Sequence, residues 1–259
     1  MPETPVLRLR GISKRFGAVQ ALSGFDLEVH SGEVVALVGD NGAGKSTAVK
    51  AIAGVNPPDQ GDIEWEGRRV GISRPHDAQN LGIATVYQDL ALCDNLDVVG
   101  NLFLGRELRR FGVLDEVRMD KRARELLETL SIRIPSVRIP VASLSGGQRQ
   151  TVAIARSLIG EPKVVILDEP TAALGVEQTA EVLDLVERLR DRGLGTILIS
   201  HNMVDVMAVA DRIAVMRLGR NNGFFDKRAT STEEIISAIT GATDSAVTRR
   251  QARKLEDER

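Results

Sequence analysis

The expected fold rests on one stretch of sequence, Val34-Val35-Ala36-Leu37-Val38-Gly39-Asp40-Asn41-Gly42-Ala43-Gly44-Lys45-Ser46. Its five leading apolar residues are typical of a strand buried on both faces of a parallel sheet. The next eight match the phosphate-loop pattern GxxxxGK(S/T), and a helix is predicted over Ser46–Ala53. Glycines let backbone N–H groups turn toward phosphate oxygens, and the helix N-terminus adds a positive dipole end. The stretch therefore predicts nucleotide binding, with a chance match in a Gly-rich turn as the alternative.

Further apolar runs predict more of the same sheet. Ile83–Tyr87, Val164–Leu167 and Thr196–Ser200 are continuous and rich in β-branched residues. Helical patterns separate them, which is the signature of an α/β fold. Three other segments alternate apolar and polar residues and predict half-solvated strands; they are Val6–Ile12, Phe25–His30 and Ile63–Glu66.

Most of the predicted helices follow the first ninety residues. Leu92–Leu108, Arg118–Leu130 and Gln148–Leu158 together predict a mostly helical insertion between two halves of the sheet. Val176–Arg192 is amphipathic, and the face expected to be buried carries Val182, Leu183, Val186 and Leu189. Ser231–Ile239 begins with a capping-box pattern of Ser231 with Glu234. Residues 1–243 are predicted to form one domain, with its core over 1–88 and 160–243, the insertion over about 89–159, and a charged tail over 244–259.

Composition excludes several classes of protein. The chain has 259 residues, of which 42% are apolar and 27% charged, so a disordered chain is excluded. A net charge of -2 and only 3% aromatic residues argue against nucleic acid as a partner. The single cysteine, Cys93, excludes an internal disulfide framework and a multi-cysteine metal site. Because no membrane span or signal peptide is visible, we expect a cytosolic chain.

Two carboxylates follow the strand predicted over Val164–Leu167. Asp168 stands at the carboxyl end of the strand, where α/β sheets bind ligands, and it can hold Mg²⁺ through water. Glu169 is suited to accept a proton from an attacking water. The alternative is a strand that simply ends at polar residues, and the phosphate loop favours the functional interpretation. Within that loop, we expect Lys45 to reach the β- and γ-phosphates and Ser46 to ligate Mg²⁺.

A second glycine-rich segment, Leu144-Ser145-Gly146-Gly147-Gln148, precedes a predicted helix. It predicts a second anion site, with Ser145 donating a hydrogen bond and Gly147 allowing close approach of the backbone. An ordinary helix cap followed by flexible glycines explains the same residues equally well. The physical chemistry of the segment leaves these two interpretations open.

Five motifs follow one another along the chain in a characteristic order. They are the phosphate loop, Gln88 after a strand, the Leu-Ser-Gly-Gly-Gln segment, Asp168-Glu169, and His201 after Thr196–Ser200. This set resembles the ATP-binding subunit of ABC transporters, from Leu7 to about Gly241. The resemblance implies a P-loop NTPase (RecA-like) core with a small antiparallel β subdomain and an inserted α-helical subdomain. It also implies binding of ATP and Mg²⁺, and ATP hydrolysis.

The resemblance also assigns roles to residues. Two such domains dock head to tail, so Ser145, Gly147 and Gln148 would contact the ATP of the other subunit. Glu169 would polarise the hydrolytic water, His201 would contact the γ-phosphate, and Gln88 would reach Mg²⁺ and the water. The implied catalytic residues are Lys45, Gln88, Glu169 and His201, and the implied Mg²⁺ ligands are Ser46, Gln88 and Asp168. The implied nucleotide-binding residues are Phe16, Gly39, Asp40, Asn41, Gly42, Ala43, Gly44, Lys45, Ser46, Thr47, Ser145, Gly147 and Gln148.

Each of the less specific positions has a structural alternative. Phe16 matches the aromatic residue that stacks on adenine in this family, but it could instead cover a sheet edge. Taken alone, His201 is an ordinary polar strand end and Gln88 a surface glutamine. Residues Asp89–Asp97 would line the groove for a permease helix, and a variable surface loop is the alternative.

One position departs from the family pattern. After Pro170-Thr171 the family often has Ser-Ala-Leu-Asp, whereas Ala172-Ala173-Leu174-Gly175 ends here in glycine. The stretch Thr171–Gly175 and the stretch Asn101–Glu107 both resemble the ATPases of bacterial sugar importers of the ribose, xylose and fructose type. The resemblance implies a second ATPase subunit, either a second copy of the chain, which would form a homodimer, or a related ATPase. It also implies a membrane permease, an external solute-binding protein acting indirectly, and a peripheral place on the cytoplasmic face of the membrane. An ATPase serving an exporter, a soluble non-transport ABC ATPase and a nucleotide sensor without turnover are the alternatives.

Overall fold

A six-stranded sheet forms the centre of the molecule, in the order β12-β11-β3-β10-β9-β6. The structure, a computed structural model, describes residues 4–242. All neighbouring pairs of this sheet are parallel except β11 with β12. The three apolar runs after the first are β6, β9 and β10, so the predicted parallel sheet is confirmed. The strands are β3 (Val34–Gly39), β6 (Ile83–Val86), β9 (Val164–Asp168), β10 (Gly195–Ile199), β11 (Arg212–Arg217) and β12 (Arg220–Asp226).

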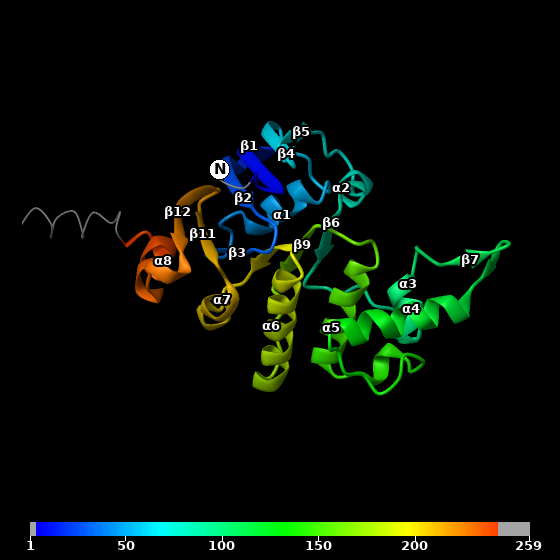
Figure 1. Cartoon of the computed structure of the whole chain (residues 1–259). Coiled ribbons are helices and arrows are strands. Elements are labelled where there is room, and N and C mark those ends of the chain that lie inside the picture. The colour runs from blue at the N-terminus through cyan, green and yellow to red at the C-terminus, as the bar shows by residue number, and fades with distance from the viewer. Residues whose placement is uncertain (1–3, 243–259) are drawn as a thin grey trace, which may run out of the picture.

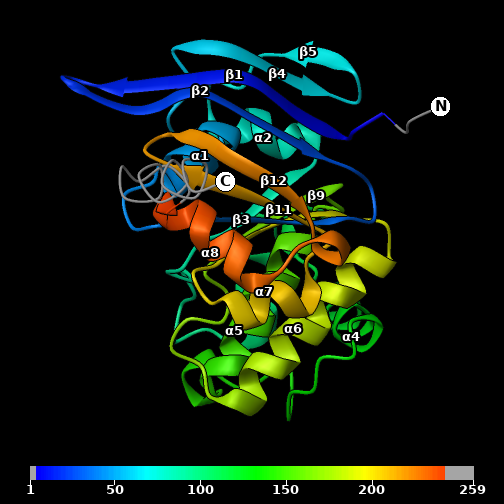
Figure 2. The same cartoon turned by 90° about the vertical axis from the view of Figure 1, so that its left-hand side faces the viewer.

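A smaller antiparallel sheet, in the order β2-β1-β4-β5, lies over one face of the central sheet (Figure 2). Its apolar face packs with helix α1 (Lys45–Ile52) and the central sheet into one core that contains Phe25, Leu37 and Val49. The predicted alternating strands are confirmed, although the second already begins at Val19. The strands are β1 (Leu7–Phe16), β2 (Val19–Val29), β4 (Gln60–Trp65) and β5 (Arg68–Val70).

Most of the other helices lie on the opposite face of the central sheet or to one side of it (Figure 1). In α6 the buried face holds Val182, Leu185, Val186 and Leu189, whereas Leu183 is half-buried. The capping box of α8 is confirmed, because Ser231 Oγ accepts a bond from Glu234 N and Glu234 Oε2 accepts one from Ser231 N. The helices are α1 (Lys45–Ile52), α2 (Pro75–Leu81), α3 (Val98–Phe103), α4 (Glu116–Thr129), α5 (Gly146–Leu158), α6 (Val176–Asp191), α7 (Met203–Val209) and α8 (Thr232–Thr240). Val141–Ser143 and Lys227–Ala229 are short 3₁₀ helices.

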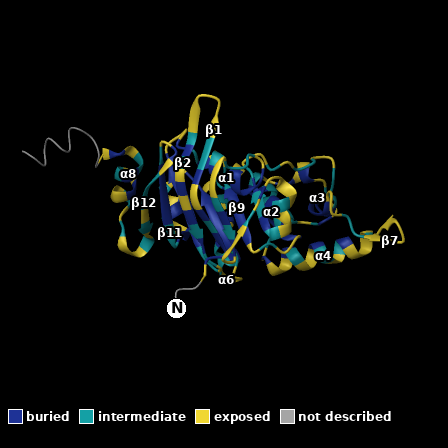
Figure 3. Ribbon diagram, turned by 90° about the horizontal axis from the view of Figure 1, so that it is seen from above, coloured by how far each residue is buried: buried dark blue, intermediate teal, exposed yellow. Residues whose placement is uncertain are grey.

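The insertion is less helical than predicted. Within Leu92–Leu108 only α3 is helical, because Asp97 caps its start and Gly105 turns the chain away at φ +76°. A two-stranded hairpin follows, β7 (Arg109–Arg110) with β8 (Val113–Leu114). Phe111 at its tip is 94% exposed, and β7 lies at the outer end of the molecule (Figure 3). The division of the chain into core and insertion stays a prediction, and the predicted tail 244–259 lies outside the described residues.

Candidate nucleotide-binding site

The loop between β3 and α1 depends on glycine for two reasons. Gly39 and Gly44 have φ of +156° and +111°, values that side-chain-bearing residues rarely adopt. A Cβ at Gly39 would lie 2.2 Å from the carbonyl oxygen of Met216, and one at Gly44 would lie 2.8 Å from that of Ala21. The loop is therefore held against β11 and β2, in a shape that only glycine allows.

Lys45 folds back over this loop. Its side chain is almost fully buried, and Nζ donates to the carbonyl oxygens of Gly39, at 2.7 Å, and Asp40, at 3.1 Å. These two neutral acceptors leave the full positive charge of the ammonium group at the mouth of the loop. A phosphate oxygen that displaced either carbonyl would form a stronger bond, because it would bring a negative acceptor to the positive ammonium group.

A cleft of about 450 Å³ opens in front of the loop and brings most of the predicted site residues together. Its walls come from four places: the start of β2, the loop with the first turn of α1, the carboxyl ends of β6, β9 and β10, and the turn after β11. The residues around it are Val19, Gln20, Ala21, Asn41, Gly42, Ala43, Gly44, Lys45, Ser46, Thr47, Gln88, Asp168, Glu169, Ile199, Leu218 and Gly219. Residues far apart in the sequence therefore face one cleft at the carboxyl edge of the sheet, as α/β folds place their ligands.

Asp168 is a half-buried carboxylate with no hydrogen bond to its side chain within residues 4–242. Burial raises its pKa, and the neighbouring Glu169 raises it further, against the opposing effect of Lys45 and Lys50. Such a group gains from a cation in the cleft. Together with the Ser46 hydroxyl it offers the hard oxygen ligands that Mg²⁺ prefers, so the residues present fit this ion.

Glu169 and His201 are in direct contact. Glu169 lies at φ +51°, in the left-handed region, and its N–H donates to the carbonyl of Ile199 on the neighbouring strand, at 2.9 Å. Its Oε2 lies 2.8 Å from His201 Nδ1. The Glu169 side chain is largely buried and that of His201 is largely exposed. The contact therefore orients the carboxylate from the solvent side of the cleft.

Phe16 stands beside the cleft rather than in it. It ends β1 and is 45% exposed, with Lys14 Nζ at 5.8 Å from the ring centroid. The residues of β2 that line the cleft begin only three positions later, at Val19. The ring is thus near the cleft and free to receive a flat partner on its exposed face.

The Ser145–Gln148 segment is not part of this cleft. Ser145 Oγ accepts a bond from Gln148 N and Gln148 Oε1 accepts one from Ser145 N, so the two residues cap α5 reciprocally. Gly147 is crowded by α6, because a Cβ there would lie 2.9 Å from Cβ of Gln178. Helix packing thus requires this glycine whether or not a ligand approaches it, a reason that the sequence pattern did not reveal.

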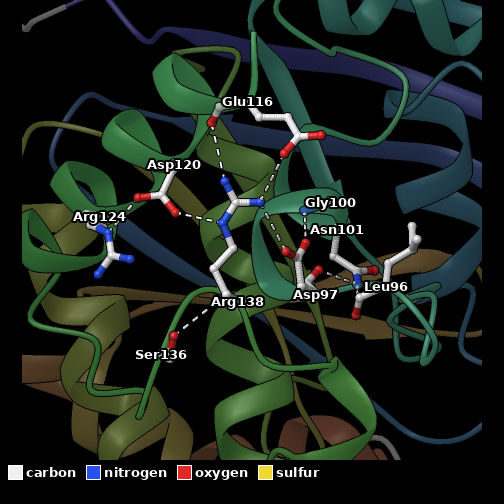
Figure 4. Close-up of polar contacts among 9 residues, drawn as sticks. All are labelled: Leu96, Asp97, Gly100, Asn101, Glu116, Asp120, Arg124, Ser136 and Arg138. Atoms are coloured by element: carbon white, nitrogen blue, oxygen red, sulfur yellow. Dashed lines mark hydrogen bonds and ion pairs between the residues drawn. The ribbon is translucent and has the colours of Figure 1, made fainter. Parts of the chain in front are cut away.

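The segment after Gln88 is joined to the segment before Ser145. The N–H groups of Val141 and Ala142 donate to the carbonyls of Leu96 and Asp94. Beside them, the Arg138 guanidinium contacts Asp97, Glu116 and Asp120, with Arg138 Nε 2.8 Å from Asp120 Oδ1 (Figure 4). The two motifs therefore belong to one connected part of the insertion.

Two side chains to which the sequence assigned no role hold the segment after Gln88 in place. Asn101 is fully buried and bonds both the N–H and the carbonyl of Cys93. From α5, Arg156 donates to the carbonyls of Leu90, at 2.8 Å, and Ala91, at 2.7 Å. Neither residue stands in a pattern that indicates such a role, because each acts on backbone atoms brought close only by the fold.

Comparison with known proteins identifies the family. The family model described as ABC transporter matches residues 22–172. The chain is 46% identical to the xylose/arabinose import ATP-binding protein of Sulfolobus acidocaldarius, over 91% of this chain and 94% of that protein. It is 45% identical to the fructose import ATP-binding protein of Rhizobium meliloti, over 94% and 97%. A ribose import ATP-binding protein of Rubrobacter xylanophilus is 44% identical over 92% of this chain, which spans only 47% of that longer protein.

Solved structures have the same fold. The ADP conformation of an ATP-binding cassette of an ABC transporter matches 91% of this chain and 95% of its own, with a TM-score of 0.79 and 27% identity. A dimeric cassette in a post-hydrolysis state, bound to ADP and Pi, matches 86% and 100%, with a TM-score of 0.72 and 25% identity. No helix within residues 4–242 is both long and apolar enough to cross a membrane. With its P-loop NTPase fold, its cleft and these relatives, the chain belongs to the ABC transporter family as an ATP-binding subunit, an ATPase coupled to transport.

Proposed function

We propose that this chain hydrolyses ATP to drive uptake of a monosaccharide through a separate membrane permease. The observation that carries the catalytic part is the single cleft in which Lys45, Ser46, Asp168 and Glu169 face one another. The solute class is supported by relatives named for import of xylose and arabinose and of fructose, each aligned over more than nine-tenths of both chains.

ATP binds with its phosphates in the loop from Gly39 to Thr47. Lys45 exchanges the carbonyls of Gly39 and Asp40 for phosphate oxygens, and the N–H groups of the loop bond the rest. The adenine stacks on the exposed face of Phe16 beside the cleft. Ser46, Gln88 and Asp168 hold Mg²⁺, which neutralises charge on the phosphates when it is bound.

Glu169 is the base for the attacking water. Its carboxylate faces the cleft and accepts the proton of the water as the water attacks the γ-phosphate. His201 holds the Glu169 carboxylate in place, and its exposed ring can reach the γ-phosphate from the solvent side. Gln88 orients the water from the end of β6.

A second copy of the chain completes each site. Ser145, Gly147 and Gln148 begin α5 outside the cleft of their own chain, which lets them contact the ATP held by the loop of a partner. A head-to-tail dimer therefore has two composite sites, and a solved cassette that is dimeric with ADP and Pi bound supports the formation of a dimer.

The permease acts through the segment after Gln88. This segment ends against the backbone before Ser145 and is bonded by Arg156 of α5. A displacement of residues 89–97 by a permease helix therefore moves the Ser145 end of α5. The subunit works at the cytoplasmic face of the membrane without nucleic acid, and an external solute-binding protein acts on it only through the permease.

Uptake of labelled sugars tests the proposal. Cells that lack the gene for this chain are supplied with the wild-type chain or with Glu169→Gln, and uptake of xylose, fructose and ribose is measured. We expect the wild-type chain alone to restore uptake of at least one of them, and purified full-length protein to hydrolyse MgATP. Loss of efflux rather than uptake would indicate an exporter, and recovery of ribosomes with the purified chain would indicate a non-transport ATPase.

A further inference from the structure

A buried carboxylate joins the segments that carry Glu169 and His201, behind the cleft. Asp205, in α7, is 5% exposed and lines no part of the cleft. Its Oδ2 accepts a bond from Thr171 Oγ1 at 2.6 Å, and its Oδ1 accepts one from Asn202 Nδ2 at 3.0 Å. One oxygen of this carboxylate therefore holds the turn after Glu169, and the other holds Asn202, the N-cap of the same helix, directly after His201.

The two donors are neighbours of the two residues in contact at the cleft. Thr171 lies two positions after Glu169, and Asn202 directly follows His201. Glu169 and His201 are themselves joined at 2.8 Å. The contacts form a closed ring around two segments of the chain. The Glu169–His201 contact joins these segments on the cleft side, and the bonds of Asp205 join them on the other side.

The turn after Glu169 needs such support because its backbone is strained. Glu169 and Ala173 have φ of +51° and +62°, which costs energy for residues other than glycine. Asn202 is held at both ends of its amide, because its Oδ1 also accepts a bond from Val204 N at 3.0 Å. The Asp205 carboxylate is therefore attached to a fixed donor on one side and to the strained turn on the other.

We propose that Asp205 is a positioning residue for hydrolysis. It holds the turn after Glu169 and the segment after His201 at the separation at which Glu169 can act as the base. The inference rests on the proposed role of Glu169. Because a displacement of about 1 Å in a reacting group can cost about 10²-fold in rate, a loosened turn lowers kcat while the phosphate loop still binds nucleotide.

The test removes each end of the link in the full-length protein. Thr171→Val removes only the hydroxyl, Thr171→Ser keeps it, and Asp205→Asn removes one acceptor from the carboxylate. We expect Thr171→Val and Asp205→Asn to lower kcat of the MgATPase by about tenfold, with KM and the Kd of a fluorescent ATP analogue changed less than about twofold. Thr171→Ser should retain wild-type kcat.

A matched control separates positioning from loss of stability. Glu33 is another largely buried carboxylate, which accepts bonds from Arg212 and from His30 N far from the cleft. Glu33→Gln should lower Tm to a similar extent as Asp205→Asn and leave kcat per folded molecule unchanged. Equal kcat losses in these two variants would overturn the inference.

The His201→Ala background gives a second test. If Thr171 and Asp205 act through the Glu169–His201 pair, Thr171→Val should cause less than about a twofold further loss of kcat once His201 is removed. A full tenfold loss in that background, or an unchanged kcat in the wild-type background, would overturn the inference. Absence of MgATPase in the wild-type chain, alone and with its permease, would instead overturn the proposed function.

Discussion

The phosphate loop and the Ser145–Gln148 segment are both glycine-rich starts of helices, but the molecule uses them differently. In the phosphate loop Gly39, Gly42 and Gly44 all have positive φ, and the loop faces the carboxylates across a cleft. In the other segment neither glycine has positive φ, and the polar groups of Ser145 and Gln148 cap their own helix. The first faces a wall of its own chain across the cleft, whereas in the second Ser145 is exposed to solvent and Gly147 is buried against α6. The first therefore lies opposite the proposed chemistry within one chain, and the second is proposed to serve the ATP of a partner chain.

The largest loss of ATPase activity is expected from a change in the cleft beside the phosphate loop. Glu169→Gln removes the base but keeps the size of the side chain, so we expect kcat of the MgATPase to fall by about 10²–10⁴-fold. Because ATP then stays bound, a dimer should accumulate with ATP in size-exclusion chromatography. Glu128→Gln, an exposed acid on α4, is the control and should turn over normally. Full turnover in Glu169→Gln would remove this residue from the proposed role.

The next prediction tests whether the phosphate loop of one chain works with the Ser145–Gln148 segment of another. Lys45→Ala disables the phosphate loop, and Ser145→Asp keeps a good helix cap while placing negative charge toward the proposed phosphates. Each variant alone should be inactive. A mixture should recover about one quarter of the wild-type rate, because half of randomly formed dimers are mixed and each contains one intact composite site of two.

The same mixture can also show that the two regions do not work together. No recovery, with both variants folded and shown to form dimers by light scattering, would mean that the two regions do not meet across chains. Unfolding measurements control for stability. The free energy of unfolding of Ser145→Asp should lie within about 0.5 kcal/mol of the wild-type value, whereas Ser145→Ala should lose about 1 kcal/mol because it lacks the helix cap.

The sequence predicted what is local and periodic. The phosphate loop, the buried strands and the Asp168-Glu169 pair each lie within a few residues, so their patterns are visible without the fold. The convergence of Gln88, Asp168 and Glu169 could also be expected, because the carboxyl ends of parallel strands share one edge of a sheet.

What the sequence could not predict depends on contacts between distant segments. Gly147 is crowded by Gln178, and Asp205 holds Thr171, across 31 and 34 positions that only the fold brings together. Leu92–Leu108, predicted as part of a mostly helical insertion, contains only the short helix α3, since the cap at Asp97 and the turn at Gly105 end the helix on both sides. The strand β12 was missed because its residues are largely polar and half-exposed.

A smaller effect on stability is expected from the charge in the cleft. Burial raises the pKa of Asp168, so the folded protein prefers the protonated carboxyl. This contribution to stability is complete below the ordinary Asp pKa and is lost as the pH rises through the raised one. Without nucleotide, Asp168→Asn should therefore be more stable than the wild type at pH 7, by about 0.5 kcal/mol after allowance for solvent screening.

Urea unfolding at pH 4 and pH 7 measures this difference. We expect the advantage of Asp168→Asn to shrink at the lower pH, because the wild-type carboxyl gains protons as the pH falls. The ranking of the two chains should reverse when MgATP is added, because the variant loses an Mg²⁺ ligand and gains less stability from binding. An advantage that is the same at both pH values would show that the charge of Asp168 is not its cause.

The smallest change in stability is expected at Gly175, the N-cap residue of α6. Its φ of −74° suits any residue, and a Cβ there would meet no atom within 4 Å. Gly175→Asp should therefore cap α6 without strain and raise the free energy of unfolding by a few tenths of a kcal/mol, since glycine is only slightly worse than Asp as a cap. If the carboxylate that the family often carries here only caps the helix, kcat and the Hill coefficient for ATP should stay unchanged. A higher Hill coefficient, with Gly175→Ser as the uncharged capping control, would show that glycine at this position weakens the coupling between the two composite sites.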